Sequence, residues 1–263
     1  MAEYFGGDHA VAVQKSLRSR MDEFARTPVL ANGGRLLNVL DPDVYGWNNV
    51  YRDAMRDGFV ALTMVDRDAA LATAREIFGG DAEFPCWEAF SGSPGDVRPM
   101  CAAACSTIDL PRGWAVTAET HPSATTIEAC QELNAAAGVM PAPRYYMAGY
   151  DVPGMSVCLW DRDGALAATA NGTMRYHPEG PLAGWFFAGG VSVDPAHRRM
   201  GLGTYVNATL LIESQKALGW RMALEQAQAD NLASVGMIAR CGLRGVPGKA
   251  TILINLSGMQ VTR

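Results

Sequence analysis

Residues 191–204 read VSVDPAHRRMGLGT, and this stretch is the most informative part of the chain. Its apolar, alternating start predicts a β-strand, and the basic turn that follows predicts the beginning of a helix. The first N–H groups of a helix have no partner within the helix and lie at the positive end of its dipole. Gly201 and Gly203 let this backbone approach a bound anion without a Cβ in the way. Together with Arg198 and Arg199, the turn predicts a phosphate-binding site.

Simpler interpretations of the same turn stay open. The two glycines are also compatible with a tight strand-to-helix connection that binds nothing, and the two arginines with solvated surface charge. A mononucleotide P-loop is disfavoured because no Gly-Lys-Ser/Thr follows the glycines. A Rossmann dinucleotide site is disfavoured as well, since Gly189 and Gly190 precede the end of the strand and the order Gly-x-Gly-x-x-Gly is absent.

The composition indicates a folded chain with a sizeable core. Hydrophobic residues make up 49% and charged residues 19% of the 263 positions, which is typical of a globular protein and not of a disordered one. The net charge of −5 disfavours nucleic acid as the main partner. No apolar run approaches the roughly 20 residues needed to span a bilayer, and the first residues show no secretory signal pattern. We therefore expect a cytoplasmic protein without a membrane or nucleic-acid partner.

The six cysteines are scattered along the chain. In a chain of this length they need not form a disulfide framework, and reduced, mostly buried thiols are the expectation for a cytosolic protein. Cys101 and Cys105 fall on one face of an expected helix. A metal site would need two more ligands, and no paired Cys or His shows metal-ligand spacing, so we expect no metal.

The pattern of the chain changes near residue 110. Residues 1–110 are expected to form a mainly helical N-terminal domain. Within it, Ser91-Gly92-Ser93-Pro94-Gly95-Asp96 is the strongest linker signal of the chain. Residues 111–263 form the second domain, in which expected strands and helices alternate.

Local signals define the elements of the second domain. Thr125-Thr126-Ile127-Glu128 fits a capping box that begins a helix, and Asp161-Arg162-Asp163-Gly164 fits the turn of a β-hairpin. The segments that follow are expected to be a strand over 185–193, a helix over 205–218, a strand over 222–226, a helix over 231–241 and a strand over 251–256. Hairpins and crossovers together predict an α/β fold with a mixed, mostly antiparallel central sheet and helices on both faces.

This order of elements resembles the fold of the Gcn5-related N-acetyltransferases, the GNAT family, over residues 111–263. Three local features carry the resemblance. The first is the strand ending in Val191-Ser192-Val193-Asp194-Pro195, and the second is the turn Arg198-x-x-Gly201-x-Gly203. The third is Asn231-x-x-Ser234 followed by a helix and Gly242-Leu243, which is similar to the closing element of the family.

The resemblance implies that the second domain binds acetyl-CoA as a cosubstrate. In the family, the pantetheine arm lies along the strand that ends at this turn, like an added strand. The N–H groups of residues 199–204 would hold the pyrophosphate, and Asn231 would hydrogen-bond the pantetheine with Ser234 nearby. The implied cofactor-binding residues are Val191, Val193, Arg198, Arg199, Met200, Gly201, Leu202, Gly203, Thr204, Asn231 and Ser234.

The residues that usually catalyse transfer in the family are not found here. A Glu on the strand before the turn often acts as the base, yet residues 185–191 carry no carboxylate. A Tyr on the last helix often acts as the acid, and Ile238 stands at that position. The remaining candidates are Glu225, a base on the strand that the family splays from its neighbour, Cys241 on the last helix, and Tyr205 after the turn.

The resemblance therefore implies an acetyl-CoA-dependent N-acetyltransferase whose acceptor is a small-molecule or peptide amine. The N-terminal domain is expected to shape the acceptor site. A degenerate second copy of the same fold and a plain helical domain both stay open for it, and a homodimer stays open for the whole. Because the usual Glu and Tyr are missing, the alternative is a non-catalytic acyl-CoA-binding regulatory protein, followed by a pure interaction scaffold.

Overall fold

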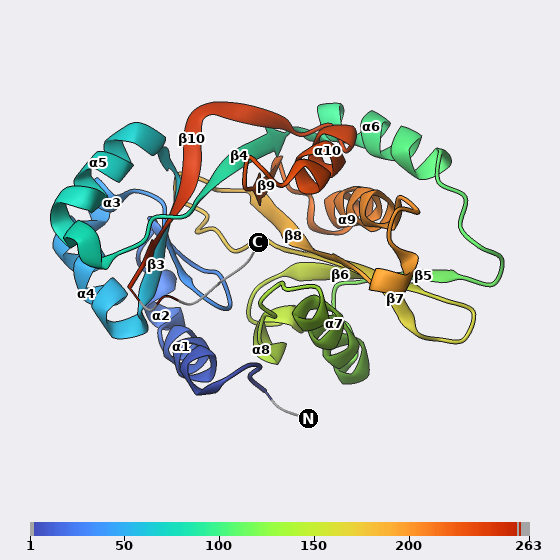
Figure 1. Ribbon diagram of the computed structural model, residues 1–263, viewed down its shortest axis with the longest axis horizontal. Coiled ribbons are helices and arrows are strands. Elements are labelled where there is room, and N and C mark those ends of the chain that lie inside the picture. The colour runs from blue at the N-terminus through green and yellow to red at the C-terminus, as the bar shows by residue number, and fades with distance from the viewer. Residues whose placement is uncertain (1–2, 257, 259–263) are drawn as a thin grey trace.

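The structure is a computed structural model and describes residues 3–256 and 258. Its centre is a ten-stranded sheet (Figure 1). Strands β2 with β3 and β8 with β9 are parallel, and the other neighbours are antiparallel. The order across the sheet is β1 (Leu30–Asn32), β2 (Leu37–Val39), β3 (Phe59–Asp66), β10 (Arg244–Asn255), β4 (Cys86–Gly92), β9 (Met222–Ala227), β8 (Trp185–Val193), β7 (Leu166–Thr173), β6 (Gly154–Trp160) and β5 (Ala115–Glu119).

Helices cover both faces of the sheet, which confirms the predicted fold class. On one face of the sheet, α6 (Pro94–Ser106) of the N-terminal half lies together with α9 (Leu202–Leu218) and α10 (Leu232–Arg240) of the C-terminal half (Figure 1). On the other face lie α7 (Ala124–Ala136) and α8 (Arg144–Met147). The N-terminal half carries α1 (Asp8–Ser19), α2 (Met21–Phe24), α3 (Pro42–Tyr45), α4 (Trp47–Asp57) and α5 (Arg67–Phe78), and the short 3-10 helices are η1 (Gly79–Asp81) and η2 (Pro195–His197).

Each half of the chain pairs its last strand with the other half. β4 follows α5 in the N-terminal half, yet its residues 88–92 pair with residues 223–227 of β9. β10 follows α10 in the C-terminal half, yet its residues 249–255 pair with residues 59–66 of β3. β4 and β10 also pair with each other. The halves on either side of residue 110 therefore share one continuous sheet through an exchange of strands.

Three strands on each side of the β10–β4 pair correspond in order: β3, β2 and β1 on one side and β9, β8 and β7 on the other. In the N-terminal half the parallel strands β2 and β3 are joined through α3 and α4, and α5 leads on to β4. In the C-terminal half the parallel strands β8 and β9 are joined through α9, and α10 leads on to β10. The helix caps correspond as well: Asp66 accepts the N–H of Ala69 at the start of α5, and Asn231 accepts that of Ser234 at the start of α10. From β1 and from β7 onward, the two halves thus show the same succession of strands and helical connections, although the sequence shows no internal repeat. Strands β5 and β6 have no counterpart among the described strands of the N-terminal half.

The predicted linker at residues 91–96 is wrong. β4 continues to Gly92, and Ser93 begins α6 through a capping box with Asp96. Ser, Pro, Gly and Asp are common in loops, but Ser at the N-cap and Pro in the first turn are equally typical of a helix start. The turn-rich composition therefore marks the beginning of α6 and not a flexible connection.

Two local predictions in the C-terminal half have opposite outcomes. The capping box at Thr125 is wrong, because Ser123 is the N-cap of α7 and accepts the N–H of Thr126. Ser and Thr are both common at the N-cap, and a candidate stands at each of the two positions, so the capping pattern alone did not identify the first residue of the helix. The hairpin turn at residues 161–164 is confirmed, since it joins β6 to β7 with the N–H of Gly164 donating to the carbonyl of Asp161.

Two apolar cores hold the halves of the sheet. The N-terminal core packs α1, α4 and α5 against β3, and it includes Ile252 and Ile254 of the exchanged β10. The C-terminal core packs α9 and α10 against β6, β7 and β8, with Phe186 and Leu210 fully buried. Burying one such side chain stabilises the folded state by roughly 1.5–3 kcal/mol. The strand exchange is therefore held by apolar burial as well as by main-chain hydrogen bonds.

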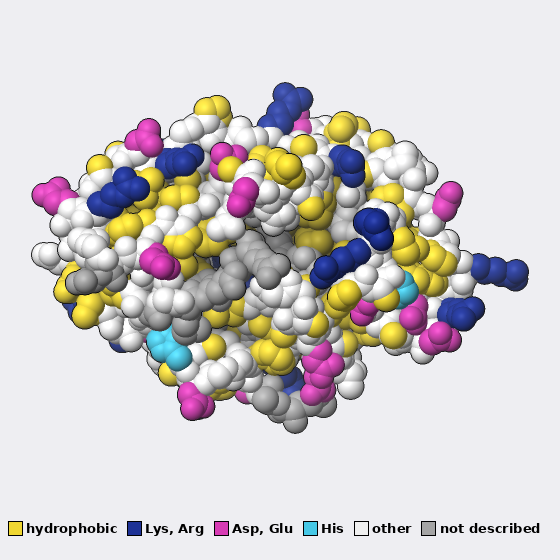
Figure 2. Space-filling view, in the orientation of Figure 1, with side chains coloured by type: hydrophobic (Ala, Val, Ile, Leu, Met, Phe, Trp, Pro, Cys, Tyr) yellow, Lys and Arg dark blue, Asp and Glu magenta, His cyan; other side chains and the backbone are white. Residues whose placement is uncertain are grey.

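The surface carries mixed charge on the face seen in Figure 2. Acidic and basic side chains are interspersed there and do not gather by sign. Within the described part of the chain, no helix is both long and apolar enough to cross a bilayer. This face therefore lacks the single-sign field that attracts a polyanion.

Candidate active site

β8 and β9 pair only where both strands begin. The parallel register joins residues 185–187 to residues 222–224. β8 then continues through residues 188–193, and no described strand pairs with it on that side. On its other side β8 stays paired with β7, with an irregularity near Gly190, whose φ is 59°. The main-chain groups of residues 188–193 are therefore open to an extended ligand that lies alongside the strand.

The turn after β8 leaves a run of main-chain N–H groups free. Arg199 has a φ of 65° and Gly201 a φ of 79°, and α9 begins at Leu202. Among the described residues, no protein group accepts a hydrogen bond from the N–H groups of residues 199–204. These groups lie at the positive end of α9, where an anion is stabilised. The turn thus offers the free main-chain donors that a phosphate site requires.

Gly203 keeps a narrow space open between this turn and β8. A Cβ at position 203 would lie 3.5 Å from Cγ2 of Val193 and 3.7 Å from Cγ1 of Val191. It would also lie 3.7 Å from Sδ of Met237 on α10. A larger side chain at position 203 would therefore fill the space where a ligand passes from the turn to the strand edge.

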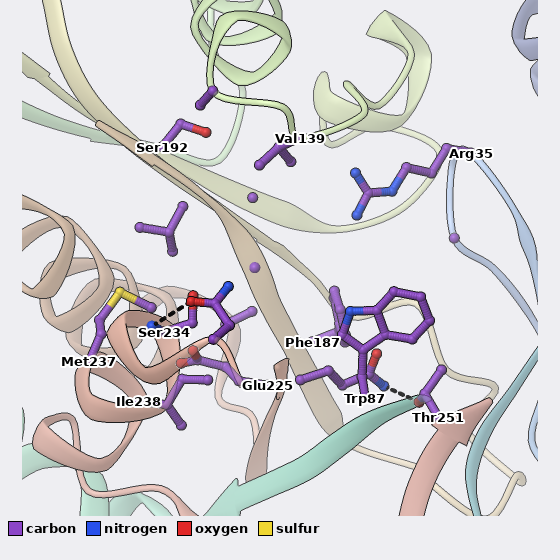
Figure 3. A pocket seen from close by; sticks show the side chains of 18 of the residues that line it. Arg35, Trp87, Val139, Phe187, Ser192, Glu225, Ser234, Met237, Ile238 and Thr251 are labelled. Carbon is purple, nitrogen blue, oxygen red and sulfur yellow. Dashed lines mark hydrogen bonds between the residues drawn. The ribbon is translucent and has the colours of Figure 1, made fainter. Parts of the chain in front are cut away.

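A cavity of about 330 Å³ lies between β8, β9 and α10 and extends toward the N-terminal half (Figure 3). Figure 3 shows Ser192, Ser234 and Met237 at one end and Arg35 and Trp87 at the other. Of the predicted cofactor residues, the structure brings into its wall Val191, Val193, Arg198, Asn231 and Ser234. The others lie in the turn, outside the described cavity wall: Arg199, Met200, Gly201, Leu202, Gly203 and Thr204.

The two polar atoms of the Asn231 side chain, Oδ1 and Nδ2, have different surroundings. Its Oδ1 accepts the N–H of Ser234 over 3.2 Å and so caps α10. Its Nδ2 has no hydrogen-bond acceptor among the described residues. Since Asn231 lines the cavity, this amide can donate to a ligand.

Glu225 is a buried carboxyl group in the wall of the cavity. It lies on β9 just beyond the last residue that pairs with β8, and its exposed fraction is 2%. Its Oε1 accepts a hydrogen bond of 2.9 Å from Nδ2 of Asn207 on α9. Burial raises the pKa of Glu225 to about 7, although the hydrogen bond from Asn207 lowers it. A carboxyl group with this pKa exchanges a proton near neutral pH, as a general base does.

The other two catalytic candidates do not line this cavity. Cys241 is fully buried behind Glu225, with its Sγ 3.5 Å from Nδ2 of Asn207. Tyr205 packs against the C-terminal core, and burial raises the pKa of its phenol. Ile238 does line the cavity, beside Glu225 in Figure 3, but it carries no proton to give. Among the sequence candidates, the geometry therefore favours Glu225.

A comparison with protein families agrees with the resemblance to the GNAT family seen in the sequence. Residues 126–243 match the sequence model of the acetyltransferase (GNAT) family. This part of the chain is a GNAT acetyltransferase domain. The comparison with curated proteins gives no match.

Solved structures share the fold over nearly the whole chain. A GCN5-related N-acetyltransferase from Kribbella flavida is 18% identical and has a TM-score of 0.58, over 94% of this chain and 96% of that one. A GCN5-related N-acetyltransferase-like protein from Streptococcus suis 89/1591 is 13% identical with a TM-score of 0.57, over 88% of this chain and 85% of that one. A tandem GNAT protein from the clavulanic acid biosynthesis pathway is 14% identical with a TM-score of 0.56, over 87% of this chain and 78% of that one. At these identities the likeness concerns the fold alone.

The turn between β8 and α9 has a differently built counterpart in the N-terminal half. The segment between β2 and α4 corresponds to it in the symmetric order of the sheet. There Asp41 caps α3, and its Oδ1 accepts the N–H groups of Asp43 and Val44 over 3.1 and 3.0 Å. A carboxylate thus occupies the N–H groups that an anion would need. Asp66 likewise stands where the GNAT domain has Asn231.

Several residues of the cavity were missed by sequence reasoning. Arg35 lies between β1 and β2, Trp87 on β4, and Arg175 just after β7, and all three line the cavity. No local motif marks them, because the exchange of strands brings them together only in three dimensions. Asn207 carried a usable signal, since it is a polar residue in the middle of an apolar helical stretch.

Proposed function

We propose that this protein transfers an acetyl group from acetyl-CoA to the amine of a small-molecule or peptide acceptor. The proposal is carried by one observation: the free N–H groups of residues 199–204 lie next to the unpaired side of β8. A diphosphate would accept hydrogen bonds from these N–H groups, and an extended amide-bearing arm would lie along the unpaired side of β8. Gly203 leaves the space between them open.

Side chains around the turn would complete this binding site. Arg198 and Arg199 add positive charge beside the N–H groups, and Nδ2 of Asn231 supplies a donor at the cavity wall. The main-chain groups of Val191 and Val193 form part of the unpaired edge of β8. The residues of the chain therefore fit the shape and charge of a coenzyme A molecule.

Glu225 is the residue that we propose as the general base. Acetyl transfer forms a C–N bond and breaks the thioester C–S bond. An ammonium acceptor loses one proton before it attacks and a second as the amide forms, and the leaving thiolate gains one. Glu225 can take the first proton, because its pKa, raised to about 7, leaves it substantially ionised at neutral pH. Asn207 holds this carboxyl group in place.

We also propose that the N-terminal half is a degenerate second GNAT copy that shapes the acceptor side of the cavity. The symmetric strand order, the two parallel pairs and the corresponding caps support this origin. The fold likeness to a tandem GNAT protein supports it as well. Since Asp41 fills the corresponding turn, we expect a single acetyl-CoA per chain. A cytoplasmic location is part of this proposal and is consistent with the unpaired cysteines of the described residues.

Calorimetry and a thiol-release assay test the proposal together. Titration with acetyl-CoA should show a single site per chain, and release of free thiol should depend on an amine from a broad panel. The Glu225→Gln variant keeps the acceptor oxygen for Asn207 and should bind acetyl-CoA while turnover falls. Glu88→Gln removes an exposed carboxylate of the sheet and serves as the matched control.

Two other outcomes would overturn the proposal. Binding of acetyl-CoA without thiol release for any amine would favour a regulatory acyl-CoA-binding protein. Failure of acetyl-CoA to bind, and to raise the melting temperature, would favour an interaction scaffold, because a ligand of the native state must stabilise it.

A further inference from the structure

Two arginines converge on the end of the cavity that is formed with the N-terminal half. Arg35 and Arg175 both line the main cavity and a smaller adjoining one of about 70 Å³. Gly189 and Gly190 of β8 line the same two cavities, so the arginines lie close to the irregular part of that strand. Figure 3 shows the guanidinium of Arg35 reaching into the cavity from the side opposite Ser234.

Neither arginine has an acidic partner. Among the described residues, no Asp or Glu oxygen lies within ion-pair distance of either guanidinium. A half-buried Arg normally pairs with a carboxylate or coordinates an anion, because removing its charge from water is otherwise costly. Two such groups side by side without a counter-charge make an electropositive pocket that an anion would neutralise.

Arg175 is held in place by aromatic rings and by weak polar contacts. Its guanidinium carbon lies 3.6 Å from the centre of the Phe187 ring and 5.4 Å from that of Tyr176. Its Nη2 donates to Oδ1 of Asn38 and to the Tyr176 hydroxyl, both at 3.5 Å. Its Nε is buried and has no hydrogen-bond partner in the described part of the chain. The side chain is thus fixed by stacking while part of its donor capacity stays unused.

Arg35 faces the same space from the N-terminal half. Its Nη1 donates to the carbonyl oxygen of Met140, which orients the guanidinium. Burial, followed by the positive charge of Arg175, lowers the pKa of Arg35 to about 10. The repulsion between the two cations is therefore felt within the pocket, and an anion placed between them would relieve it.

We propose that Arg35 and Arg175 bind a carboxylate of the acceptor, so that the substrate class is an amine that also carries a carboxyl group. This inference rests on the proposed acetyl transfer. The planar N–H groups of a guanidinium match the two oxygens of a carboxylate. The cofactor residues lie at the opposite end of the cavity, and Glu225 lies in the wall beside Ser234 and Ile238 (Figure 3). An acceptor held by its carboxylate would direct its amine toward Glu225.

The first experiment compares matched acceptors. Amino acids and their carboxamides differ only in the charged group, so the ratio of their kcat/KM values measures what the arginines contribute. The wild-type ratio should be at least tenfold in favour of the free carboxylates. Arg35→Gln and Arg175→Gln should each reduce it severalfold, and Arg112→Gln, which removes an exposed arginine, should leave it unchanged.

The second experiment measures the binding of acetylated products in the absence of turnover. N-acetyl amino acids should raise the melting temperature of the wild-type protein in the presence of coenzyme A, and their carboxamides should raise it less. This difference should disappear in Arg175→Gln. Calorimetry on the same variants should give an acetyl-CoA dissociation constant within about twofold of the wild type, which separates this inference from the proposed acetyl transfer itself.

Two results would overturn the inference while the proposed function stands. One is acetyl-CoA binding and turnover with no preference for carboxylated amines. The other is a preference that follows the acyl donor: if succinyl-CoA with a neutral amine outperforms acetyl-CoA, and the arginine variants abolish that advantage, the pocket binds the carboxylate of the acyl group and not of the acceptor.

Discussion

Asn207 donates a hydrogen bond of 2.9 Å from Nδ2 to Oε1 of Glu225, and both side chains are buried. Burial favours the neutral carboxylic acid, whereas the donated hydrogen bond favours the carboxylate. The balance raises the pKa of Glu225 to about 7. The cavity wall therefore contains a group that changes charge in the range where an amine must be deprotonated.

The activity should rise with pH through the titration of Glu225. We expect kcat/KM of the wild type to increase toward a plateau, with an apparent pKa of about 7. Glu225→Gln should lower kcat by about a hundredfold or more and should flatten this limb of the profile, since a positioned base typically contributes that much. A pH–rate profile of both proteins checks this. An unchanged profile in the variant would assign the base to another group.

The free energy of unfolding should fall, while the activity rises, as the pH increases through the titration of Glu225. The pKa of Glu225 is higher in the folded protein than its ordinary value of 4.5, so the folded state binds more protons between pH 4.5 and about 7. The contribution of this group is therefore present at low pH and is lost as the pH rises through that window, by up to about 3 kcal/mol. Urea unfolding at pH 5 and pH 8 should show Glu225→Gln gaining stability relative to the wild type at the higher pH. An equal difference at both pH values would contradict the shifted pKa.

Substitution of Gly203 should prevent acetyl-CoA from binding. In Gly203→Val the added side chain would enter the space bounded by Val191, Val193 and Met237, so calorimetry should show at least a tenfold weaker dissociation constant. Gly95→Val, at an exposed position of α6 where a Cβ meets only Ser93 Oγ at 3.6 Å, is the matched control and should bind normally. Circular dichroism should show that both variants fold. Normal binding by Gly203→Val would remove the turn from the site.

Two substitutions at Asn231 separate its cap from its free amide. Asn231→Ala removes both functions and should cost about 1 kcal/mol of unfolding free energy as well as affinity. Asn231→Asp keeps an oxygen to cap α10, as Asp66 does for α5, but it lacks the Nδ2 donor. We expect Asn231→Asp to keep its melting temperature and to bind acetyl-CoA about fivefold more weakly, the equivalent of about 1 kcal/mol. Equal affinity for wild type and Asn231→Asp would exclude the amide from the site.

The exchange of strands should keep the two halves together after the chain is cut. A protease site introduced at the exposed Arg112 allows cleavage of the folded protein. Because β4 pairs with β9 and β10 with β3, the two fragments should elute as one species from a sizing column. Residues 111–263 expressed alone would leave Ile252 and Ile254 uncovered and should aggregate. Two separately folded monomers would contradict the observed pairing.

Sequence reasoning succeeded where a feature depends on neighbouring residues. The strand over 185–193, the helix that follows the basic turn and the helix over 231–241 follow from local patterns, because apolar periodicity and helix-start residues lie at fixed spacing. The choice of Ser123 over Thr125 could not be made, since both residues suit an N-cap. Local rules thus predict elements well and their exact ends less well.

Features that join distant segments could not be predicted in this way. The pairing of β4 with β9 depends on contacts between the two halves, and neither strand carries a mark of its partner. The approach of Arg35 to Arg175 is of the same kind, because it depends on how the loop between β1 and β2 lies over the end of β7. The pKa of Glu225 also depends on the packing of α9, which places Asn207 beside it.

The pairing of β10 with β4 at the centre of the sheet limits how a ligand can reach the cavity. A hinge motion that parted the two lobes of the sheet would have to break the main-chain bonds between β10 and β4, the strands at its centre. Displacing loops around the cavity leaves this pairing intact, whereas swinging the two lobes apart does not, so we expect ligands to enter by local loop movement.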